Sequence, residues 1–163
     1  KVLVELKYYG HDVDLEARTA RVIEQAGMAD QVAIMSLKYP AILKMREIRP
    51  DWRTGVLAAT AVGNITRLDG DFVAVNVHQV GPRLLSAAKT AGKDVYAWTV
   101  NDPLEMSAMI SLGVDGIITD EPALARQVLI ERASMSSPER LLLLVAERLG
   151  LSLPTGEYRD ASP

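Results

Sequence analysis

The sequence alternates short apolar stretches with helix-type patterns, and this alternation limits the possible folds more than any other feature. The starts of the strand-type runs follow each other at intervals of about twenty to thirty residues, which is typical of β/α units and a parallel sheet. Several runs are apolar without alternation, as expected for strands that are covered on both faces. Six strands are predicted, over Val2–Leu6, Gln31–Ser36, Arg53–Leu57, Phe72–Val77, Asp94–Thr99 and Gly116–Thr119.

Boundary signals predict helices between these strands. Asp102-Pro103-Leu104-Glu105 is a capping box with proline at the first helical position, and Gly113 closes its helix. Residues 58–71 carry at most a short helix near Asn64–Leu68. The other helices are expected to start after Asp12 or Asp14, at Pro40, at Pro82 and after Asp120, the first three ending at Gly27, Pro50 and Gly92. The first helix carries an apolar stripe of Leu15, Val22, Ile23 and Ala26.

Six β/α units fit either a barrel or an open doubly wound sheet. No strand is followed by a glycine-rich nucleotide-binding motif, which argues against dinucleotide and nucleotide sites. A complete (β/α)8 barrel needs about 250 residues, whereas this chain has 163. A barrel interpretation therefore predicts a partial barrel over residues 1–133, with at least two units lying upstream of residue 1.

The C-terminal part is expected to be separate from these units. Ser136-Ser-Pro-Glu139 is a second capping box and predicts a helix over residues 136–150. This helix either packs on the barrel or serves a partner or a membrane surface. Residues 151–163 are rich in serine, proline, glycine and charge, and we expect a disordered tail.

Composition excludes several classes of function. The chain has no cysteine, which excludes thiolate zinc sites, disulfides and thiol nucleophiles. The formal net charge is −3 and no basic face or arm is evident, so nucleic-acid binding has little support. No apolar run approaches the roughly 18 residues that suggest a membrane span.

The first strand carries two opposite charges, Glu5 and Lys7, within an apolar run. Side chains alternate faces along a strand, so Glu5 and Lys7 point to the same side. Burying an unpaired charge is expensive. The pair therefore forms an internal salt bridge or acts on a ligand, and the residues alone leave both readings open.

The ends of four strands together resemble a known family. The runs are Val4-Glu5-Leu6-Lys7, Ala33-Ile-Met-Ser36, Val95-Tyr-Ala-Trp98-Thr99-Val100-Asn101 and Gly113-Val-Asp-Gly-Ile-Ile-Thr119-Asp120-Glu-Pro122. In this order they are similar to the glycerophosphodiester phosphodiesterase family, over residues 1 to about 130. The resemblance implies a (β/α)8 barrel that hydrolyses glycerophosphodiesters to glycerol 3-phosphate and an alcohol with a divalent cation, Ca²⁺ or Mg²⁺.

The resemblance is incomplete in one respect. The family's catalytic His-Arg-Gly motif and its Glu-x-Asp pair are absent from this sequence, and its His-Asp motif is absent ahead of the Glu-x-Lys strand, since the dipeptide His11-Asp12 follows that strand. All three precede the Glu-x-Lys strand in the family, so no catalytic histidine is expected in this chain. The chain alone is therefore expected to be inactive.

The resemblance also assigns roles to individual residues. Glu5 would be a metal ligand and Lys7 would hold the phosphate, while Trp98 would contact the glycerol or alcohol, or else fill the barrel mouth. Ser36 and Asn76 would line the pocket or satisfy a loop backbone. His11 and His78 stand outside the family's histidine motifs and are interpreted as loop residues.

The resemblance implies a small-molecule glycerophosphodiester substrate and, from the members it is most similar to, a membrane-anchored parent protein. Two other readings stay open. The chain can be a non-catalytic fragment that forms homo-oligomers through its sheet edges. It can also belong to a different phosphate-binding barrel enzyme that isomerises sugar phosphates, because the run from Gly113 to Thr119 would fit a phosphate loop.

Overall fold

The structure is a computed structural model that describes residues 1–10, 13–59, 63–136, 138–139, 142 and 145 of the 163-residue chain. Six parallel strands pair in chain order to form one sheet. The strands are β1 (Val2–Glu5), β2 (Val32–Ser36), β3 (Arg53–Ala58), β4 (Phe72–Asn76), β5 (Asp94–Trp98) and β6 (Gly116–Ile117). The helices are α1 (Leu15–Gln25), α2 (Tyr39–Ile48), α3 (Pro82–Thr90), α4 (Pro103–Leu112) and α5 (Pro122–Ser134).

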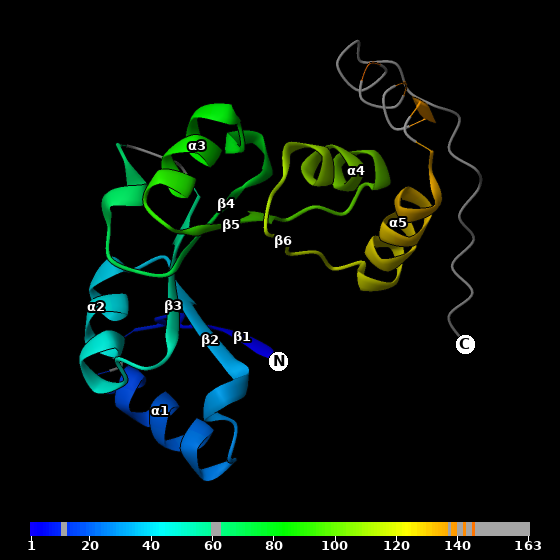
Figure 1. The fold of residues 1–163 in the computed structure, drawn as a ribbon. Helices are drawn as coiled ribbons and strands as arrows, with labels where there is room; N and C mark the ends of the chain where they lie inside the picture. The colour runs from blue at the N-terminus through cyan, green and yellow to red at the C-terminus, as the bar shows by residue number, and fades with distance from the viewer. Residues whose placement is uncertain (11–12, 60–62, 137, 140–141, 143–144, 146–163) are drawn as a thin grey trace.

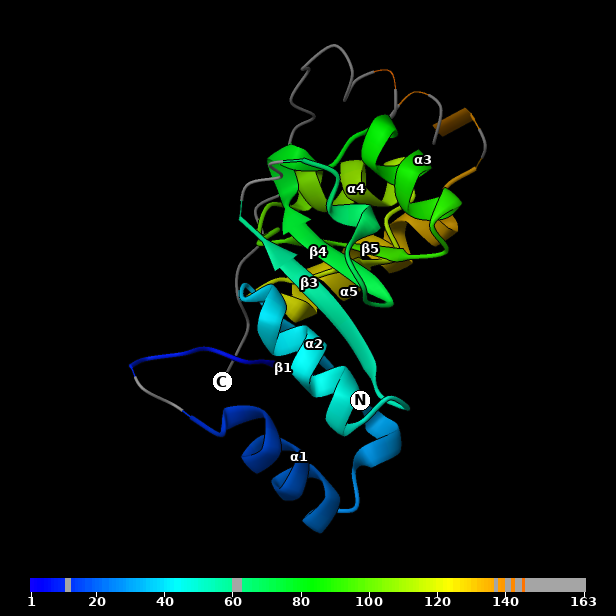
Figure 2. The same cartoon turned by 90° about the vertical axis from the view of Figure 1, so that its left-hand side faces the viewer.

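The sheet is curved, and the helices follow the outer side of its arc (Figure 1). A view from the left-hand side shows α1 and α2 in front of the strands, with α3 and α4 further along the same side (Figure 2). A doubly wound sheet would place helices on both faces. The arrangement is therefore a partial β/α barrel, and the predicted fold class is confirmed.

The alternation of side chains along the strands separates two apolar layers. Directly after β1, Leu6 packs with Ile34 and with α1 and α2 on the outer side. Leu3 belongs instead to the inner layer, together with Met35 and Phe72. The inner layer also contains the stacked rings of Phe72 and Tyr96, whose centroids lie 4.8 Å apart. The parity of a residue on its strand thus decides whether it faces the helices or the barrel interior.

Glycine makes room for this inner layer. Gly55 on β3 pairs with Phe72 on β4. A Cβ atom on Gly55 would lie 2.1 Å from the Phe72 ring, so no larger residue fits there without a shift.

The described residues of the stretch 58–71 form no full-length helix, as the sequence predicts. The described part holds one short 3-10 helix, Ile65–Arg67, in which the Asn64 side chain accepts a hydrogen bond from the Thr66 amide. This connection is the one between β3 and β4. The side chains that cover the outer face there include Ile65 and Leu68.

Two details of the predicted helices are wrong. Val22 is 64% exposed, and the buried stripe of α1 is formed by Glu16, Ala20 and Ile23. Asp120 does not cap α5, because Glu121 occupies the N-cap position. The Asp120 carboxylate accepts a hydrogen bond from the Asn101 amide instead, at 2.9 Å.

The C-terminal predictions fall mostly outside the described residues. The expected capping contact is present, since the Glu139 carboxylate accepts hydrogen bonds from the Ser136 amide at 2.7 Å and from its hydroxyl at 2.6 Å. The remainder of the expected helix over 136–150 and the tail over 151–163 are not described. None of the described helices combines the length and the apolar character needed to span a bilayer.

Candidate active site

Glu5 and Lys7 lie where β1 ends, and Glu5 is on its inner side. Leu3, two residues earlier, belongs to the inner layer, so Glu5 faces the same way. The Lys7 ammonium lies 3.5 Å from Glu5 Oε2, and the two side chains are 54% and 23% exposed. Glu5 and Lys7 therefore form the internal salt bridge that was one of the two possibilities from the sequence.

This ion pair contributes little to stability. Exposed pairs are worth about 0–1 kcal/mol, because solvent screens them and ordering two side chains costs entropy. Glu5 and Lys7 are both partly open to water. Their interaction alone does not explain why two charges occupy an otherwise apolar strand.

Asn76 and Trp98 lie on the same inner side at the ends of β4 and β5, where they pair in register. Both are partly buried. The Asn76 side-chain oxygen Oδ1 accepts a hydrogen bond from the His78 amide, as the loop-backbone reading expects. The indole N–H of Trp98 is buried and has no hydrogen-bond partner among the described residues.

Ser36 does not join this group. Its side chain is fully buried and faces the outer layer, like Ile34 on the same strand. Its hydroxyl donates to the Leu6 carbonyl at 2.8 Å and accepts from the Lys38 amide at 3.1 Å. Ser36 thus ties the end of β2 to the end of β1, which matches the backbone role left open by the sequence.

The described structure places one of the two histidines. His78 is exposed in the short helix after β4. His11 lies outside the described residues.

A second polar group escaped the sequence analysis. Glu16 on α1 is only 3% exposed and accepts a hydrogen bond from the Tyr8 hydroxyl. Its other carboxylate oxygen lies 3.1 Å from the Lys44 ammonium on α2. Burial opposes the ionisation of Glu16, but the hydrogen bond from Tyr8 and the Lys44 charge outweigh it and hold the pKa of Glu16 below its ordinary value. The sequence signal that could have identified this group is a glutamate at a helix position whose neighbours one turn away are buried.

Asn101, Thr119 and Asp120 join the ends of β5 and β6. Asn101 Oδ1 accepts from the Thr119 hydroxyl at 3.0 Å and from the Asp120 amide at 2.9 Å. The Thr119 hydroxyl oxygen also accepts from the Glu121 amide, which connects the group to the start of α5. These hydrogen bonds hold the loop next to Trp98. They account for Asn101 in the run Val95–Asn101 and for Thr119 and Asp120 in the run Gly113–Pro122.

Glu5 is the carboxylate that the inner side of β1 presents at this end of the sheet. No group of three or more acidic, histidine or cysteine side chains that could hold a metal ion occurs among them. Ca²⁺ takes six to eight oxygen ligands, and Mg²⁺ takes six. Glu5 therefore fits one position of such a site, and the described residues do not complete it.

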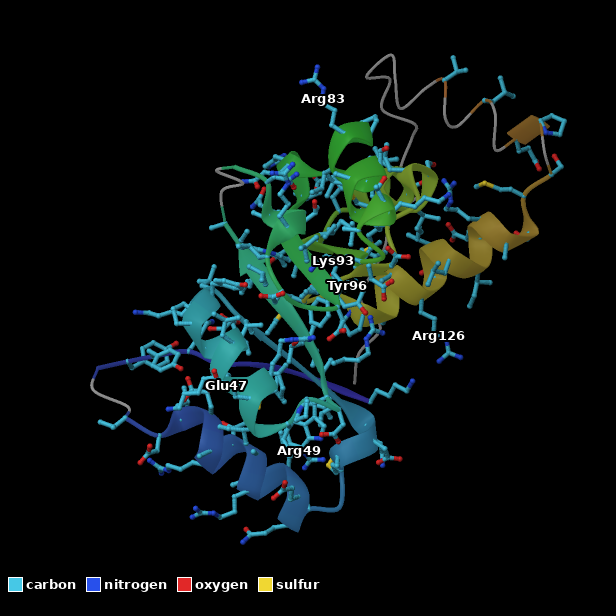
Figure 3. The ribbon with its side chains drawn as sticks, turned by 60° about the vertical axis from the view of Figure 1, so that its left-hand side comes forward. Glu47, Arg49, Arg83, Lys93, Tyr96 and Arg126 are labelled. Carbon is cyan, nitrogen blue, oxygen red and sulfur yellow. The ribbon has the colours of Figure 1, made fainter. Side chains whose placement is uncertain are left out.

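A cavity of about 340 Å³ opens at the other end of the strands, and its lining includes Leu3, Ala33, Arg53 and Tyr96. Figure 3 shows Tyr96 and Lys93 within the body of the molecule, whereas Glu47 and Arg83 point outward. Active sites of β/α barrels lie at the carboxyl ends of the strands. The cavity is therefore separate from the Glu5 end, which is the candidate active site.

The comparisons with known proteins agree on one family. The model of the glycerophosphoryl diester phosphodiesterase family matches residues 6–124. The chain is 26% identical over 112 residues to the glycerophosphodiester phosphodiesterase of Caldanaerobacter subterraneus subsp. tengcongensis, covering 66% of this chain and 46% of that protein. The chain spans about half the length of the curated relatives it matches.

Solved structures share the fold. A glycerophosphodiester phosphodiesterase from Parabacteroides distasonis superposes with a TM-score of 0.71 at 24% identity, covering 81% of this chain and 58% of that one. A phosphodiesterase from Oleispira antarctica, solved in complex with the product sn-glycerol-3-phosphate, has a TM-score of 0.70 at 21% identity, covering 77% and 53%. Because the family model matches most of the chain, this protein belongs to the glycerophosphoryl diester phosphodiesterase family.

Proposed function

We propose that this chain forms the phosphate-binding part of an enzyme that hydrolyses glycerophosphodiesters to glycerol 3-phosphate and an alcohol. The observation that carries the proposal is the Glu5–Lys7 pair, which lies at the carboxyl end of an edge strand and is partly open to solvent. A carboxylate and an ammonium at one strand end suit a cation and a phosphate together. The family of the chain supports this reading.

In the proposed reaction a water oxygen forms a bond to phosphorus, the bond between phosphorus and the alcohol oxygen breaks, and the alcohol leaves with a proton. Lys7 would bind the phosphoryl oxygens as a point charge. No general acid or base is assigned to the described residues. Trp98 would contact the glycerol or alcohol, and its position on the inner side at the end of β5, in register with Asn76, supports that role.

Glu5 would be one ligand of the divalent cation, Ca²⁺ or Mg²⁺. When bound, such a cation neutralises charge on the phosphoryl oxygens. Glu5 lies 3.5 Å from the Lys7 ammonium, so a cation on Glu5 and a phosphate on Lys7 would be neighbours.

Calorimetric titration of the purified chain with glycerol 3-phosphate, with and without calcium, tests the proposal. We expect Lys7→Gln to weaken binding about tenfold or more, because a charged hydrogen bond is lost. Glu5→Gln should remove the effect of calcium. Lys89→Gln and Glu47→Gln change exposed charges elsewhere and serve as matched controls. Binding by the Lys7→Gln chain equal to that of the wild type would refute the assignment.

Hydrolysis itself is tested with glycerophosphocholine as the probe diester. The 163-residue chain alone should release no glycerol 3-phosphate, because no catalytic histidine of the family is expected in it. Calcium-dependent release by the chain alone would show that the assignment has missed the catalytic residues.

A further inference from the structure

The segment that carries Lys7 is held from both sides by groups that are not part of the Glu5–Lys7 pair. On one side, the Leu6 amide donates to the Met35 carbonyl at 2.8 Å, and the Leu6 carbonyl accepts from the Ser36 hydroxyl. On the other side, the Tyr8 hydroxyl donates to the buried carboxylate of Glu16. Lys7 is thus flanked by two anchored neighbours, while its own side chain is exposed.

The second anchor reaches across three elements. Glu16 is in the first turn of α1, and Lys44, which pairs with it, is on α2. The Lys44 ammonium also donates to the Val13 carbonyl at 3.3 Å, in the loop between β1 and α1. The Lys38 ammonium lies 5.7 Å from the centre of the Tyr8 ring. Both ends of the β1–α1 loop are therefore attached to the same carboxylate and its partner.

Stability alone does not account for this group. Taking a carboxylate out of water costs several kcal/mol, and an apolar pair of similar volume often serves stability equally well. A hydrogen bond to a tyrosine hydroxyl is directional, which an apolar contact is not. The buried Glu16 carboxylate orients Tyr8, the residue after Lys7. This arrangement indicates that the position of this segment matters.

We propose that Tyr8, Glu16 and Lys44 are positioning residues that fix the end of β1 and so aim Lys7 toward a bound phosphate. This inference rests on the proposed function of Lys7. The three residues touch neither the substrate nor the cation, and they act through the backbone between Leu6 and Tyr8.

Amide hydrogen exchange followed by NMR tests the anchoring without any ligand. Tyr8→Phe and Glu16→Gln should speed exchange of the Leu6 amide about tenfold, measured relative to the Ala74 amide in the central strand β4, because a local anchor is lost. Lys44→Met should act in the same direction, and Lys44→Arg should restore slow exchange. Equal acceleration at Leu6 and Ala74 would mean general destabilisation and would overturn the inference.

A matched control is available in the same helix pair. Glu24 on α1 pairs with Arg49, the C-cap residue directly after α2, at 2.5 Å. Glu24→Gln therefore removes a carboxylate between the same two helices while leaving the Tyr8 anchor intact. It should leave the relative exchange of Leu6 unchanged, and a change as large as that in Glu16→Gln would contradict the inference.

The effect on the ligand is measured with inorganic phosphate as the probe. Tyr8→Phe and Glu16→Gln should weaken binding about fivefold, and Glu24→Gln should not. If Lys7→Gln leaves phosphate binding unchanged, the proposed function fails, whereas faster exchange at Leu6 still shows that the anchor holds the strand end. If Lys7→Gln weakens binding and the anchor variants do not, the positioning role is refuted.

Discussion

Gly55 shows how one absent side chain determines the inner face of the sheet. Phe72 fills the space beside Gly55, is fully buried, and stacks on Tyr96. The three residues belong to β3, β4 and β5, so a single position couples three strands. The requirement for glycine at position 55 is steric, because a Cβ atom there would overlap the phenyl ring of Phe72.

Gly55→Ala should lower the free energy of unfolding by about 1–3 kcal/mol, as overpacking does in other cores. Urea denaturation followed by circular dichroism measures it. Gly81→Ala is the comparison, because no atom lies within 4 Å of the added methyl group. A smaller loss for Gly55→Ala than for Gly81→Ala would mean that the Phe72 ring moves aside freely.

At the scale of elements, two aspartates occupy equivalent N-cap positions with different outcomes. Asp102 accepts hydrogen bonds from the Leu104 amide at 2.8 Å and from the Glu105 amide at 3.0 Å. Asp14, at the N-cap of α1, makes no side-chain capping hydrogen bond. Of these two aspartates, Asp102 therefore makes the capping contact that the sequence predicts and Asp14 does not.

Asp102→Ala should cost about 1 kcal/mol, the usual value of an N-cap hydrogen bond, and lower the melting temperature. Asp14→Ala should cost much less. Differential scanning calorimetry of both variants compares two helices of one protein. Equal losses would show that the capping contact of Asp102 contributes nothing beyond its charge.

The sequence predicts the elements well because their signals are local. Periodicity, prolines and capping residues lie within each strand or helix, and all six strands occur where expected. The hydrogen bond of Asp120 was not predicted, because its partner, Asn101, is nineteen positions away. Glu16 escaped prediction for the same reason, since Tyr8 and Lys44 come from other elements. Glu5 and Lys7 share a strand, so their pairing was readable from alternation.

At the scale of the whole molecule, the anchor around Glu16 links stability to pH. The pKa of Glu16 is lower in the folded chain than its ordinary value of 4.5. The folded state therefore binds fewer protons, and this contribution to stability is fully present above pH 4.5. It is lost as the pH falls through the lowered pKa of the folded state.

Glu16→Gln should flatten the loss of stability below pH 4.5 relative to the wild type. Urea midpoints at several pH values between 3 and 7 measure the slope. Glu24→Gln removes an exposed carboxylate from the same helix and should keep more of the wild-type slope. An unchanged slope in Glu16→Gln would show that other carboxylates govern acid unfolding.

The open sheet also bears on assembly. Among the described residues, β1 and β6 are the two edges, and the inner layer includes the partly exposed rings of Tyr96 and Trp98. Unpaired edges and apolar surface favour association. We predict that the 163-residue chain forms homo-oligomers, measured by light scattering during size-exclusion chromatography. A monomer at micromolar concentration would exclude the self-associating alternative.

The pairing of each strand with its neighbour in the chain has a consequence for how the molecule acquires its structure. Paired residues lie 17 to 30 positions apart, so contact order between strands is low. Low contact order favours rapid folding. A newly synthesised chain can add one unit at a time, each using the previous strand as a template. The register of the central strands is then fixed before the last strand, β6, is in place.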